Sequence, residues 1–339
     1  MFYYHGMQEL YTHLKQYGKV KLNEPLAKHT TFKIGGPAQF FVTVDETDTL
    51  ISLLKFLDSE GTPYVILGGG SNTLARDEAF DGVVVAIRNR KLEIDGDVVV
   101  ADAGCVTVAV SQASMRAGLT GFEWGVGVPG TIGGAVRGNA GAMGGDIQKD
   151  VLKVQAYRDG EVIQLTNEEC QFGYRDSTFK REGGVVLRVY LQLEKATPDS
   201  VLMKKALEHL QYRNSTQPQG FASSGCIFKN VDIGQQTTDN RQQTVAKKNR
   251  QLLMQHVSDD NEKVKRFLEI GKISAGWLIE QAGLKGRRVG NVEISEKHGN
   301  FLVNLGGATA EEVRMLIEEV KQEVYTRFGI ELEEEVVIF

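Results

Sequence analysis

Residues 121–145 read "GFEWGVGVPGTIGGAVRGNAGAMGG" and contain ten glycines in twenty-five positions. A second cluster, "LGGGSN", occupies residues 67–72 directly after the apolar run "PYVI". Glycines at this density let backbone N–H groups come close to a flat or anionic ligand, because no Cβ intervenes. The cluster "LGGGSN" alone is equally compatible with tight turns in a β-rich domain. Two clusters, each after a strand-like run, favour a dinucleotide held between loops.

The same clusters argue against two common nucleotide-binding folds. Neither contains the G-x-G-x-x-G fingerprint between a strand and a helix, so a Rossmann site is not expected. No G-x-x-x-x-G-K-[ST] phosphate loop occurs in the sequence either. The glycines therefore predict a dinucleotide site of another architecture.

The composition limits the remaining classes of function. The chain has 339 residues, enough for two or three domains with sizeable cores, and a net charge of −5. This net negative charge does not indicate the basic surface that a nucleic-acid-binding protein needs. No signal-peptide pattern opens the sequence, and no apolar run has the length of a membrane span. We expect a cytoplasmic protein that contacts neither nucleic acid nor membrane.

The three cysteines, Cys105, Cys170 and Cys226, are far apart in the sequence. Their odd number and wide spacing do not form a disulfide framework or a C-x-x-C zinc pattern, so no metal site is expected. Cys226 lies within "FASSGCIFKN", residues 221–230, and has two interpretations. Local sequence favours a small buried hydrophobe in a strand. The alternative is a thiol at the edge of a polar pocket, where it could donate a proton.

Helical and strand patterns follow one another irregularly, which favours α+β domains over one alternating βαβ sheet. Residues 46–60 place four leucines at helical spacing, and Gly61 follows as a C′ residue. Thr309 and Glu312 form a capping box before an apolar stripe that closes at Gly329. Further helices are expected over 107–119 and 200–213, and strands over 81–87, 97–104, 151–157 and 185–193.

Residues 231–272 differ from the rest of the chain. The segment opens with a polar, glutamine-rich stretch over 231–251, which is expected to be a loop. One or two short helices should follow, because five apolar residues fit a helix face: Leu253, Val257, Val264, Phe267 and Leu268. We interpret the whole segment as an insertion, and as a peripheral elaboration without a chemical role.

Eight motifs together resemble the UDP-N-acetylenolpyruvoylglucosamine reductase (MurB) family. They occur in the family's order and cover nearly the whole chain, except the first two dozen residues and the insertion. The motifs are "TTFKIGGPA" (30–38), "LGGGSN" (67–72), "GVPGTIGGAVRGNAGAMGG" (127–145), "YRDSTFK" (174–180), "RNSTQP" (213–218), "SSGCIFKN" (223–230), "SAGWLIEQAGLKG" (274–286) and "LEEEVVIF" (332–339).

The resemblance implies an α+β fold of two domains. An FAD-binding domain of the vanillyl-alcohol-oxidase/PCMH type would span 23–195, in two α+β subdomains of about 23–90 and 91–195. A C-terminal α+β substrate-binding domain would span 200–339 and carry the insertion at about 231–272. Residues 1–22 would form an N-terminal helical extension. We expect a monomer.

The family's cofactor is FAD, and the resemblance implies NADPH as co-substrate. No histidine lies in either glycine-rich stretch and only Cys105 lies nearby, so the FAD is expected to be non-covalent. The residues that match the family's FAD-binding motifs are Gly68, Gly69, Gly70, Ser71, Asn72, Gly127, Pro129, Gly130, Gly133, Gly134, Ala135, Asn139 and Gly141.

The resemblance also implies the catalytic residues. Arg175 matches the arginine that holds the enolpyruvyl carboxylate, and Glu335 matches the C-terminal glutamate near the same group. Cys226 stands where the family usually has a serine that protonates the substrate carbon. A fixed guanidinium and a protonated carboxyl can stabilise the enolate charge, and a thiol can then act as general acid. The expected UDP-sugar contacts are Tyr174, Arg213, Lys229 and Asn230.

The implied activity is that of UDP-N-acetylmuramate dehydrogenase: reduction of UDP-N-acetylglucosamine-enolpyruvate in peptidoglycan synthesis, which serves cell-wall biogenesis, cell shape and cell division. The short spacing between Arg175 and Cys226 resembles the family type without an extra tyrosine-bearing loop. Val231 replaces a usual proline, Val337 replaces a frequent arginine, and the insertion separates two motifs that are normally close. Two other classes stay open: an alcohol-oxidising FAD enzyme of the same fold, and a non-catalytic binding protein.

Overall fold

The computed structural model describes residues 2–196, 199–234, 240–256 and 262–339. The described residues form two compact units. Unit 1 comprises Met1–His29, Gly36–Gly70 and Glu78–Ser215, and unit 2 comprises Thr30–Gly35, Ser71–Asp77 and Thr216–Phe339. Two short segments of the N-terminal half thus belong to the C-terminal unit. The sequence-based boundary between 195 and 200 differs from this division, because the following helix groups with unit 1 as far as Ser215.

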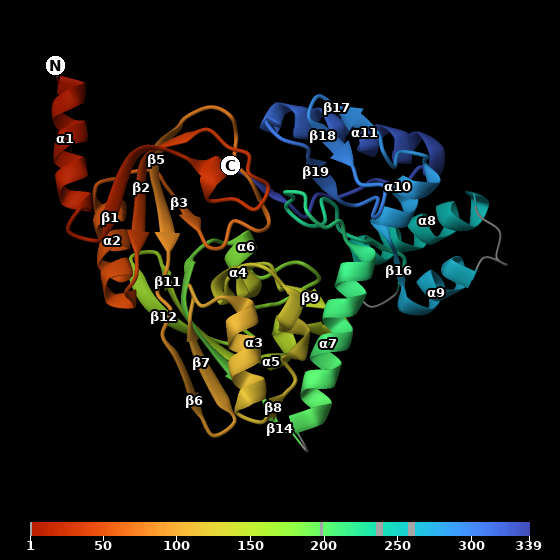
Figure 1. Cartoon of the computed structure of the whole chain (residues 1–339), viewed down its shortest axis with the longest axis horizontal. Coiled ribbons are helices and arrows are strands. Elements are labelled where there is room, and N and C mark those ends of the chain that lie inside the picture. The colour runs from red at the N-terminus through yellow and green to blue at the C-terminus, as the bar shows by residue number, and fades with distance from the viewer. Residues whose placement is uncertain (1, 197–198, 235–239, 257–261) are drawn as a thin grey trace. The chain divides into compact units, whose positions relative to one another are not determined.

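The first sheet of unit 1 has the strand order β1-β2-β5-β3 (Figure 1). It consists of β1 (Lys19–Pro25), β2 (Pro37–Val44), β5 (Phe80–Ile87) and β3 (Tyr64–Leu67). β1 is antiparallel to β2, whereas β2 and β3 are both parallel to β5. Helix α2 (Thr47–Ser59) connects β2 to β3 and buries all four of its predicted leucines. The helix prediction for residues 46–60 is confirmed to within one residue at each end, and Gly61 has the left-handed φ of +59° expected after the helix.

Helix α1 (Phe2–Leu14) lies at the N-terminus. Strand β1 follows it, and the short helix η1 (Leu26–Lys28) comes after β1. The expected helical extension over 1–22 is therefore wrong for residues 19–22. These residues are extended because they pair with β2, from Lys19 opposite Thr43 to Leu22 opposite Phe40.

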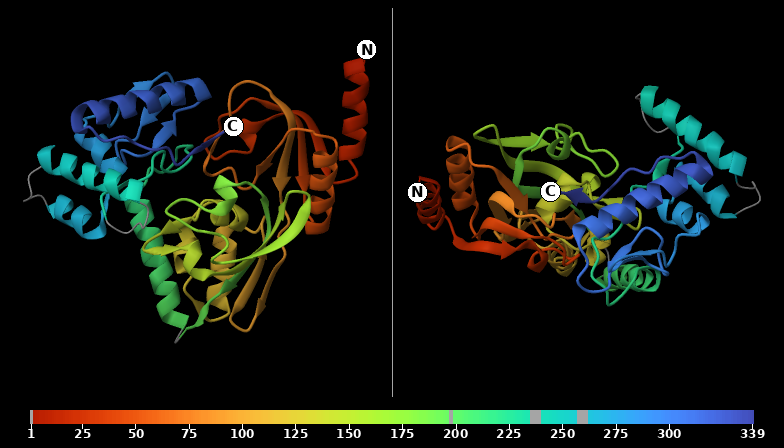
Figure 2. Two further views of the ribbon diagram at one scale, coloured as in Figure 1. Left: turned by 180° about the vertical axis from the view of Figure 1, so that it is seen from behind. Right: turned by 90° about the horizontal axis from the view of Figure 1, so that it is seen from above.

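The second sheet of unit 1 has five antiparallel strands in the order β12-β11-β13-β7-β6 (Figure 2). They are β12 (Glu161–Thr166), β11 (Val151–Arg158), β13 (Val185–Gln192), β7 (Val98–Asp102) and β6 (Leu92–Asp95).

Two predicted helices of unit 1 are also confirmed, as α3 (Thr107–Arg116) and α7 (Asp199–Thr216). The short elements are β8 (Leu119–Thr120), η2 (Glu123–Gly127), α4 (Ile132–Arg137), β9 (Gly141–Ala142), β10 (Gly145–Asp146), α5 (Ile147–Asp150), α6 (Thr178–Arg181) and β14 (Glu194–Lys195).

Both sheets of unit 1 contribute to one hydrophobic core. Phe40 and Val85 of the first sheet belong to the same buried cluster as Val154 and Val189 of the second. Helix α4 adds Ile132 to this cluster. The glycine-rich segment 127–145 is thereby attached to the core of unit 1 at its middle.

Unit 2 is built around the long helix α11 (Ala310–Phe328) and a three-stranded antiparallel sheet, β17-β18-β19. The predicted capping box is present, since Thr309 Oγ1 accepts from the Glu312 N–H and the Glu312 carboxylate accepts from the Thr309 N–H. Asp77, from the N-terminal half, accepts hydrogen bonds from the N–H groups of Ala310 and Glu311. The strands are β17 (Arg288–Val289), β18 (Val292–Ile294) and β19 (Leu302–Asn304), and helix α10 (Ala275–Gln281) completes the core.

The insertion is closed by a two-stranded pairing of β15 (Val231–Asp232) with β16 (Lys272–Ile273). Val231 opens this pairing opposite Ile273. Two helices lie between the strands, α8 (Asn240–His256) and α9 (Glu262–Ile270), and Val257 lies outside the described residues.

The prediction of a loop over residues 231–251 is partly wrong, because residues 240–251 belong to α8. Lysine, arginine and glutamine are adequate helix formers, and this helix is stabilised by burial of Ala246 and Leu253. Leu253 and Val264 are fully buried in the core of unit 2. The insertion thus contributes side chains to the core of unit 2.

Candidate functional site

The two glycine-rich segments touch each other in unit 1. A Cβ on Gly68 would lie 2.6 Å from Thr131 Oγ1, and a Cβ on Gly69 would lie 2.7 Å from the Cα of Gly130. Neither position therefore has space for a side chain. Arg88 Nη1 donates to the Gly68 carbonyl oxygen at 2.9 Å, which holds the first loop at the end of β3. Glycine at these two positions therefore allows the two loops to pack directly against each other.

Helix α4 uses its first N–H groups within the protein. The Ile132 N–H donates to the Cys105 carbonyl and the Gly133 N–H donates to the Ala103 carbonyl. Thr131 Oγ1 caps the helix by accepting from the Gly134 N–H at 3.4 Å. Gly133 thus serves close packing, because a Cβ there would lie 2.8 Å from that of Ala103, whereas a Cβ on Gly134 would make only an ordinary contact of 3.6 Å with Thr131 Oγ1.

Both ends of the second glycine-rich segment, residues 127–145, are packed against larger side chains. Arg213, from α7, occupies the space where Gly127 would carry a Cβ, and Trp124 does the same for Gly145. Trp124 Nε1 also donates to the buried carboxyl of Asp150 at 3.1 Å. Burial raises the pKa of Asp150 to about 7.

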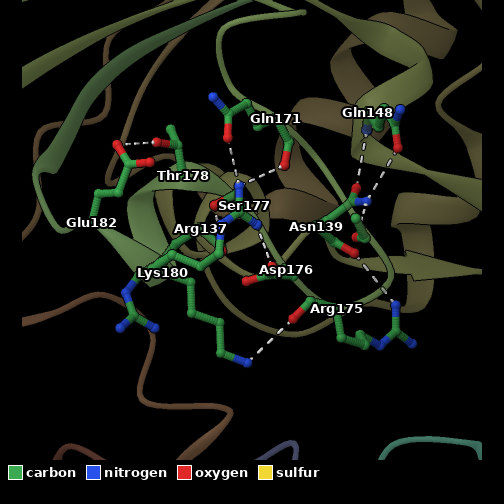
Figure 3. Close-up of polar contacts among 12 residues, drawn as sticks. Arg137, Asn139, Gln148, Gln171, Arg175, Asp176, Ser177, Thr178, Lys180 and Glu182 are labelled. Carbon is green, nitrogen blue, oxygen red and sulfur yellow. Dashed lines mark hydrogen bonds and ion pairs between the residues drawn. The ribbon is translucent and has the colours of Figure 1, made fainter. Parts of the chain in front are cut away.

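Arg175 is held by the same segment (Figure 3). Its Nη2 donates to the Gly141 carbonyl at 3.0 Å and its Nη1 to the Asn139 carbonyl at 3.5 Å. Asn139 Nδ2 in turn donates at 2.7 Å to the carbonyl of Gly173, two residues before the arginine. Carbonyl oxygens orient a guanidinium without cancelling its positive charge. The two carbonyl groups therefore fix the orientation of the Arg175 guanidinium.

The backbone of Arg175 is strained, with a φ of +56°. A non-glycine residue in this region costs on the order of 1 kcal/mol or more, and such residues concentrate at functional sites. Lys180 Nζ donates to the Arg175 carbonyl at 3.2 Å and helps to hold this conformation. Tyr174 lies beside the guanidinium, whose Cζ is 5.5 Å from the ring centroid, and is 40% exposed.

Cys226 and Glu335 lie on neighbouring segments of unit 2. The Glu335 N–H donates to the carbonyl of Ile227, the residue after the cysteine, at 2.7 Å. On the other side Cys226 forms a bridge with Phe301, and the Ile227 N–H donates to the Asn300 carbonyl at 3.0 Å. The segment "SGCIFKN" is thus the middle one of three extended segments.

Cys226 differs from the other two cysteines in exposure. Cys105 and Cys170 are buried, whereas Cys226 is half-buried and the two residues after it are buried. Burial raises the pKa of both Cys105 and Cys170 to about 11. The Cys105 thiol also donates to the Lys91 carbonyl at 3.2 Å. Of the three cysteines, Cys226 is therefore the most exposed.

The expected substrate contacts are divided between the units. Tyr174 and Arg213 belong to unit 1, and Lys229 and Asn230 to unit 2. Lys229 Nζ lies 2.5 Å from Glu333 Oε1, with its side chain 14% exposed. Asn230 Oδ1 accepts from the Ala275 N–H at the start of α10.

Two contacts at the glycine-rich loops have no signal in the sequence. Nothing near Arg88 indicates that its guanidinium holds Gly68. Likewise, the motif "LGGGSN" suggests a cofactor contact for Asn72, whereas its side-chain Nδ2 donates to the carbonyl of Glu335 at 3.0 Å. Within the described ranges, no cluster of His, Cys, Asp and Glu could hold a metal ion, and no helix has the length and apolar character of a membrane span.

Comparison with known proteins places both units in one family. A model of the C-terminal domain of UDP-N-acetylenolpyruvoylglucosamine reductase matches residues 217–339, and a model of an FAD binding domain matches residues 38–166. UDP-N-acetylenolpyruvoylglucosamine reductase from Bacillus subtilis is 35% identical over 96% of this chain and 95% of its own length. The protein of that name from Geobacter metallireducens is 35% identical over 97% of each chain.

A solved structure agrees with the sequence comparison. The crystal structure of MurB from Thermus caldophilus superimposes with a TM-score of 0.72 at 32% identity, over 95% of this chain and 98% of that one. The predicted α+β fold, an FAD-binding domain of the PCMH type followed by the family's C-terminal domain, is confirmed. The chain belongs to the UDP-N-acetylenolpyruvoylglucosamine reductase family.

Proposed function

We propose that this protein is an FAD-dependent UDP-N-acetylmuramate dehydrogenase, which reduces the enolpyruvyl group of UDP-N-acetylglucosamine-enolpyruvate with NADPH in peptidoglycan synthesis. The observation that carries this proposal is the hydrogen bond from the Glu335 N–H to the Ile227 carbonyl, because it joins the backbone of the segment that carries this acidic residue to the backbone of the segment that carries Cys226, the half-buried one of the three cysteines. Bound FAD supplies the hydride that it receives from NADPH. The residues of the chain bind the substrate, orient it and supply the proton.

The cofactor would lie against the glycine-rich loops of unit 1. Gly68 and Gly69 meet Thr131 and Gly130 without room for a Cβ, so the two loops lie together, and backbone N–H groups in such glycine-rich loops are suitable donors for a pyrophosphate. Non-covalent binding is supported by Cys105, since its buried thiol already donates to a carbonyl and its pKa is raised to about 11 by burial. A thiol of this kind is a poor nucleophile for covalent attachment.

Arg175 would bind the enolpyruvyl carboxylate. Its guanidinium is oriented by the carbonyl groups of Asn139 and Gly141, so binding of a substrate carboxylate would require little reorientation of the side chain. As hydride arrives at the β-carbon, negative charge grows on that carboxylate. The fixed arginine then stabilises the transition state more than the ground state.

Cys226 would protonate the α-carbon of the substrate, and Glu335 would stabilise the developing charge in its protonated form. A thiol ordinarily has a pKa of about 8.5, so it is a better acid near neutral pH than a serine hydroxyl. Tyr174, Arg213, Lys229 and Asn230 would bind the UDP-sugar, for which cations and hydrogen-bond donors are suitable partners. We further propose a cytoplasmic monomer that contributes to cell shape and division.

The test is the oxidation of NADPH by the purified protein with and without the enolpyruvyl substrate. Substrate should stimulate oxidation strongly, and acid precipitation should release FAD into the supernatant. Oxidation of NADPH that is indifferent to the substrate would reject the proposed reaction. Flavin that remains in the protein pellet would reject non-covalent binding and favour the covalent alcohol-oxidase alternative.

A further inference from the structure

Asn72, the last residue of the motif "LGGGSN", makes two hydrogen bonds to the C-terminal segment. Asn72 Nδ2 donates to the Glu335 carbonyl at 3.0 Å, and the Val337 N–H donates to the Asn72 carbonyl at 3.0 Å. From there β4 (Thr73–Leu74) runs parallel to β20 (Val337–Ile338). All of these residues belong to unit 2.

The backbone of Glu335 is thereby fixed from both sides. Its N–H is bound by Ile227, next to Cys226, and its carbonyl is bound by Asn72. The first bond comes from the main chain, which any residue could provide. The second comes from a side-chain amide, so it depends on the identity of residue 72.

We propose that Asn72 is a positioning residue for Glu335, which couples the order of the first glycine-rich loop to the placement of the proposed acid. This inference rests on the proposed function. Gly70 and Ser71 directly precede Asn72, so a ligand that orders residues 68–71 also orders the amide that holds Glu335. A charge-stabilising group is effective only when it is held within about 0.5 Å of its productive position.

Asn72 could serve the motif "LGGGSN" in two ways, by binding the cofactor or by positioning Glu335. If Asn72 only bound the cofactor, its loss would release FAD and slow both half-reactions. If it positions Glu335, its loss should leave the FAD bound and reduction by NADPH intact. Only reoxidation by the enolpyruvyl substrate should slow, by roughly tenfold, the usual equivalent of one hydrogen bond.

The experiment compares Asn72→Ala and the isosteric Asn72→Asp with Glu335→Gln and with the double variant Asn72→Ala/Glu335→Gln. Each holoenzyme is tested for FAD content, for both half-reactions by rapid mixing, and for hydrogen exchange in residues 332–339. Thr73→Val is the matched control, because it changes the next residue of the strand and keeps its backbone pairing.

We expect both Asn72 variants to retain FAD, to exchange faster in residues 332–339 and to reoxidise slowly. In the Glu335→Gln background the same alanine substitution should slow reoxidation by less than about twofold, because coupled residues are non-additive. Full additivity, or loss of FAD with both half-reactions slowed alike, would overturn the inference. A Glu335→Gln enzyme that reoxidises at the parental rate would instead show that the proposed role of Glu335 is wrong.

Discussion

The glycine-rich segments of unit 1 and the three extended segments around Cys226 in unit 2 are built by opposite means. In unit 1 the decisive contacts exist because side chains are missing, as where Gly69 meets Gly130. In unit 2 they exist because particular side chains are present. Asn300 is the clearest case, since its buried amide donates to the Phe228 carbonyl at 2.8 Å and accepts from the Phe228 N–H at 2.9 Å.

This difference predicts how each region responds to mutation. A backbone surface tolerates no added atom at the contact points and is indifferent to most changes elsewhere. A surface of side chains responds to the removal of single functional groups. Substitutions in the two regions should therefore differ in their effects on cofactor binding and on turnover.

Gly69→Ala should cause the largest loss. The new Cβ would lie 2.7 Å from the Cα of Gly130, and backbone cannot give way there as a flexible side chain could. Overpacking of this kind costs about 1–3 kcal/mol, and separation of the two loops should also weaken cofactor binding. We expect most of the FAD to be lost on gel filtration, measured by flavin absorbance per chain.

Gly138→Ala is the control for this substitution. Gly138 lies in the same segment, but its φ is −96° and its added Cβ would be 3.6 Å from the Gly134 carbonyl oxygen, an ordinary contact. This variant should keep its FAD. If Gly69→Ala held the cofactor as firmly as Gly138→Ala, the two loops would not form the proposed surface.

Cys226→Ala should have the next largest effect, confined to one half-reaction. NADPH should still reduce the flavin at a near-normal rate, since that step needs no proton from Cys226. Reoxidation by the enolpyruvyl substrate should slow by roughly 10²-fold or more, the usual size of a general-acid contribution. Rapid-mixing absorbance measures the two steps separately.

Cys226→Ser is the matched variant, because it keeps a hydroxyl that can donate a proton at the same position. It should retain substantial turnover. An alanine variant that reoxidises like the parent would contradict the general-acid role and leave Cys226 as a packing residue.

Asp150→Asn should change stability in a pH-dependent way. The carboxyl of Asp150 is 7% exposed, and burial raises its pKa from the ordinary 3.8 to about 7. Between these values the folded protein binds the proton more tightly than the unfolded chain, so the free energy of unfolding falls as the pH rises from about 4 to about 7. The full shift corresponds to about 4 kcal/mol as an upper limit.

Asparagine is uncharged and can still accept from Trp124 Nε1, so the variant should lose this slope and be more stable than the parent at pH 8. Thermal unfolding at pH 5 and pH 8 measures the difference. A variant at the exposed Asp95 controls for the loss of a charge. The explanation fails if Asp150→Asn and the parent keep the same pH slope.

Glu333→Gln should have the smallest effect. Its carboxylate pairs with Lys229 but is 73% exposed, and exposed ion pairs contribute about 0–1 kcal/mol. Turnover should stay within about twofold of the parent in a steady-state assay. A large loss here would mean that Lys229 depends on Glu333, and that this acidic residue belongs to the site.

The sequence predicted the regular elements well where periodicity and caps agree. The leucines of α2 and the capping box of α11 are local signals, and the ordered motifs were sufficient for the family. Helix α8 was missed over residues 240–251 because its polar residues gave little amphipathic pattern, and burial of residues such as Leu253 stabilises it.

The division of the chain could not be predicted from local patterns. Residues 30–35 join unit 2 through contacts such as Asn304 Nδ2 with the Phe32 carbonyl at 3.0 Å, between residues far apart in sequence. Nor does any local pattern indicate that Asn72 holds the carbonyl of Glu335. Motifs identify residues that function together but carry no information about which backbone groups they bind.

The pairing of β4 with β20 has a consequence for the order of folding. The bond between Asn72 and Glu335 joins residues 263 positions apart, and closing a chain of that length costs on the order of 5 kcal/mol in entropy. Contacts of such long range form slowly, whereas both sheets of unit 1 pair strands from the N-terminal two thirds of the chain. We expect refolding to complete the glycine-rich surface first, and to form the bond between Asn72 and Glu335 as one of its last events.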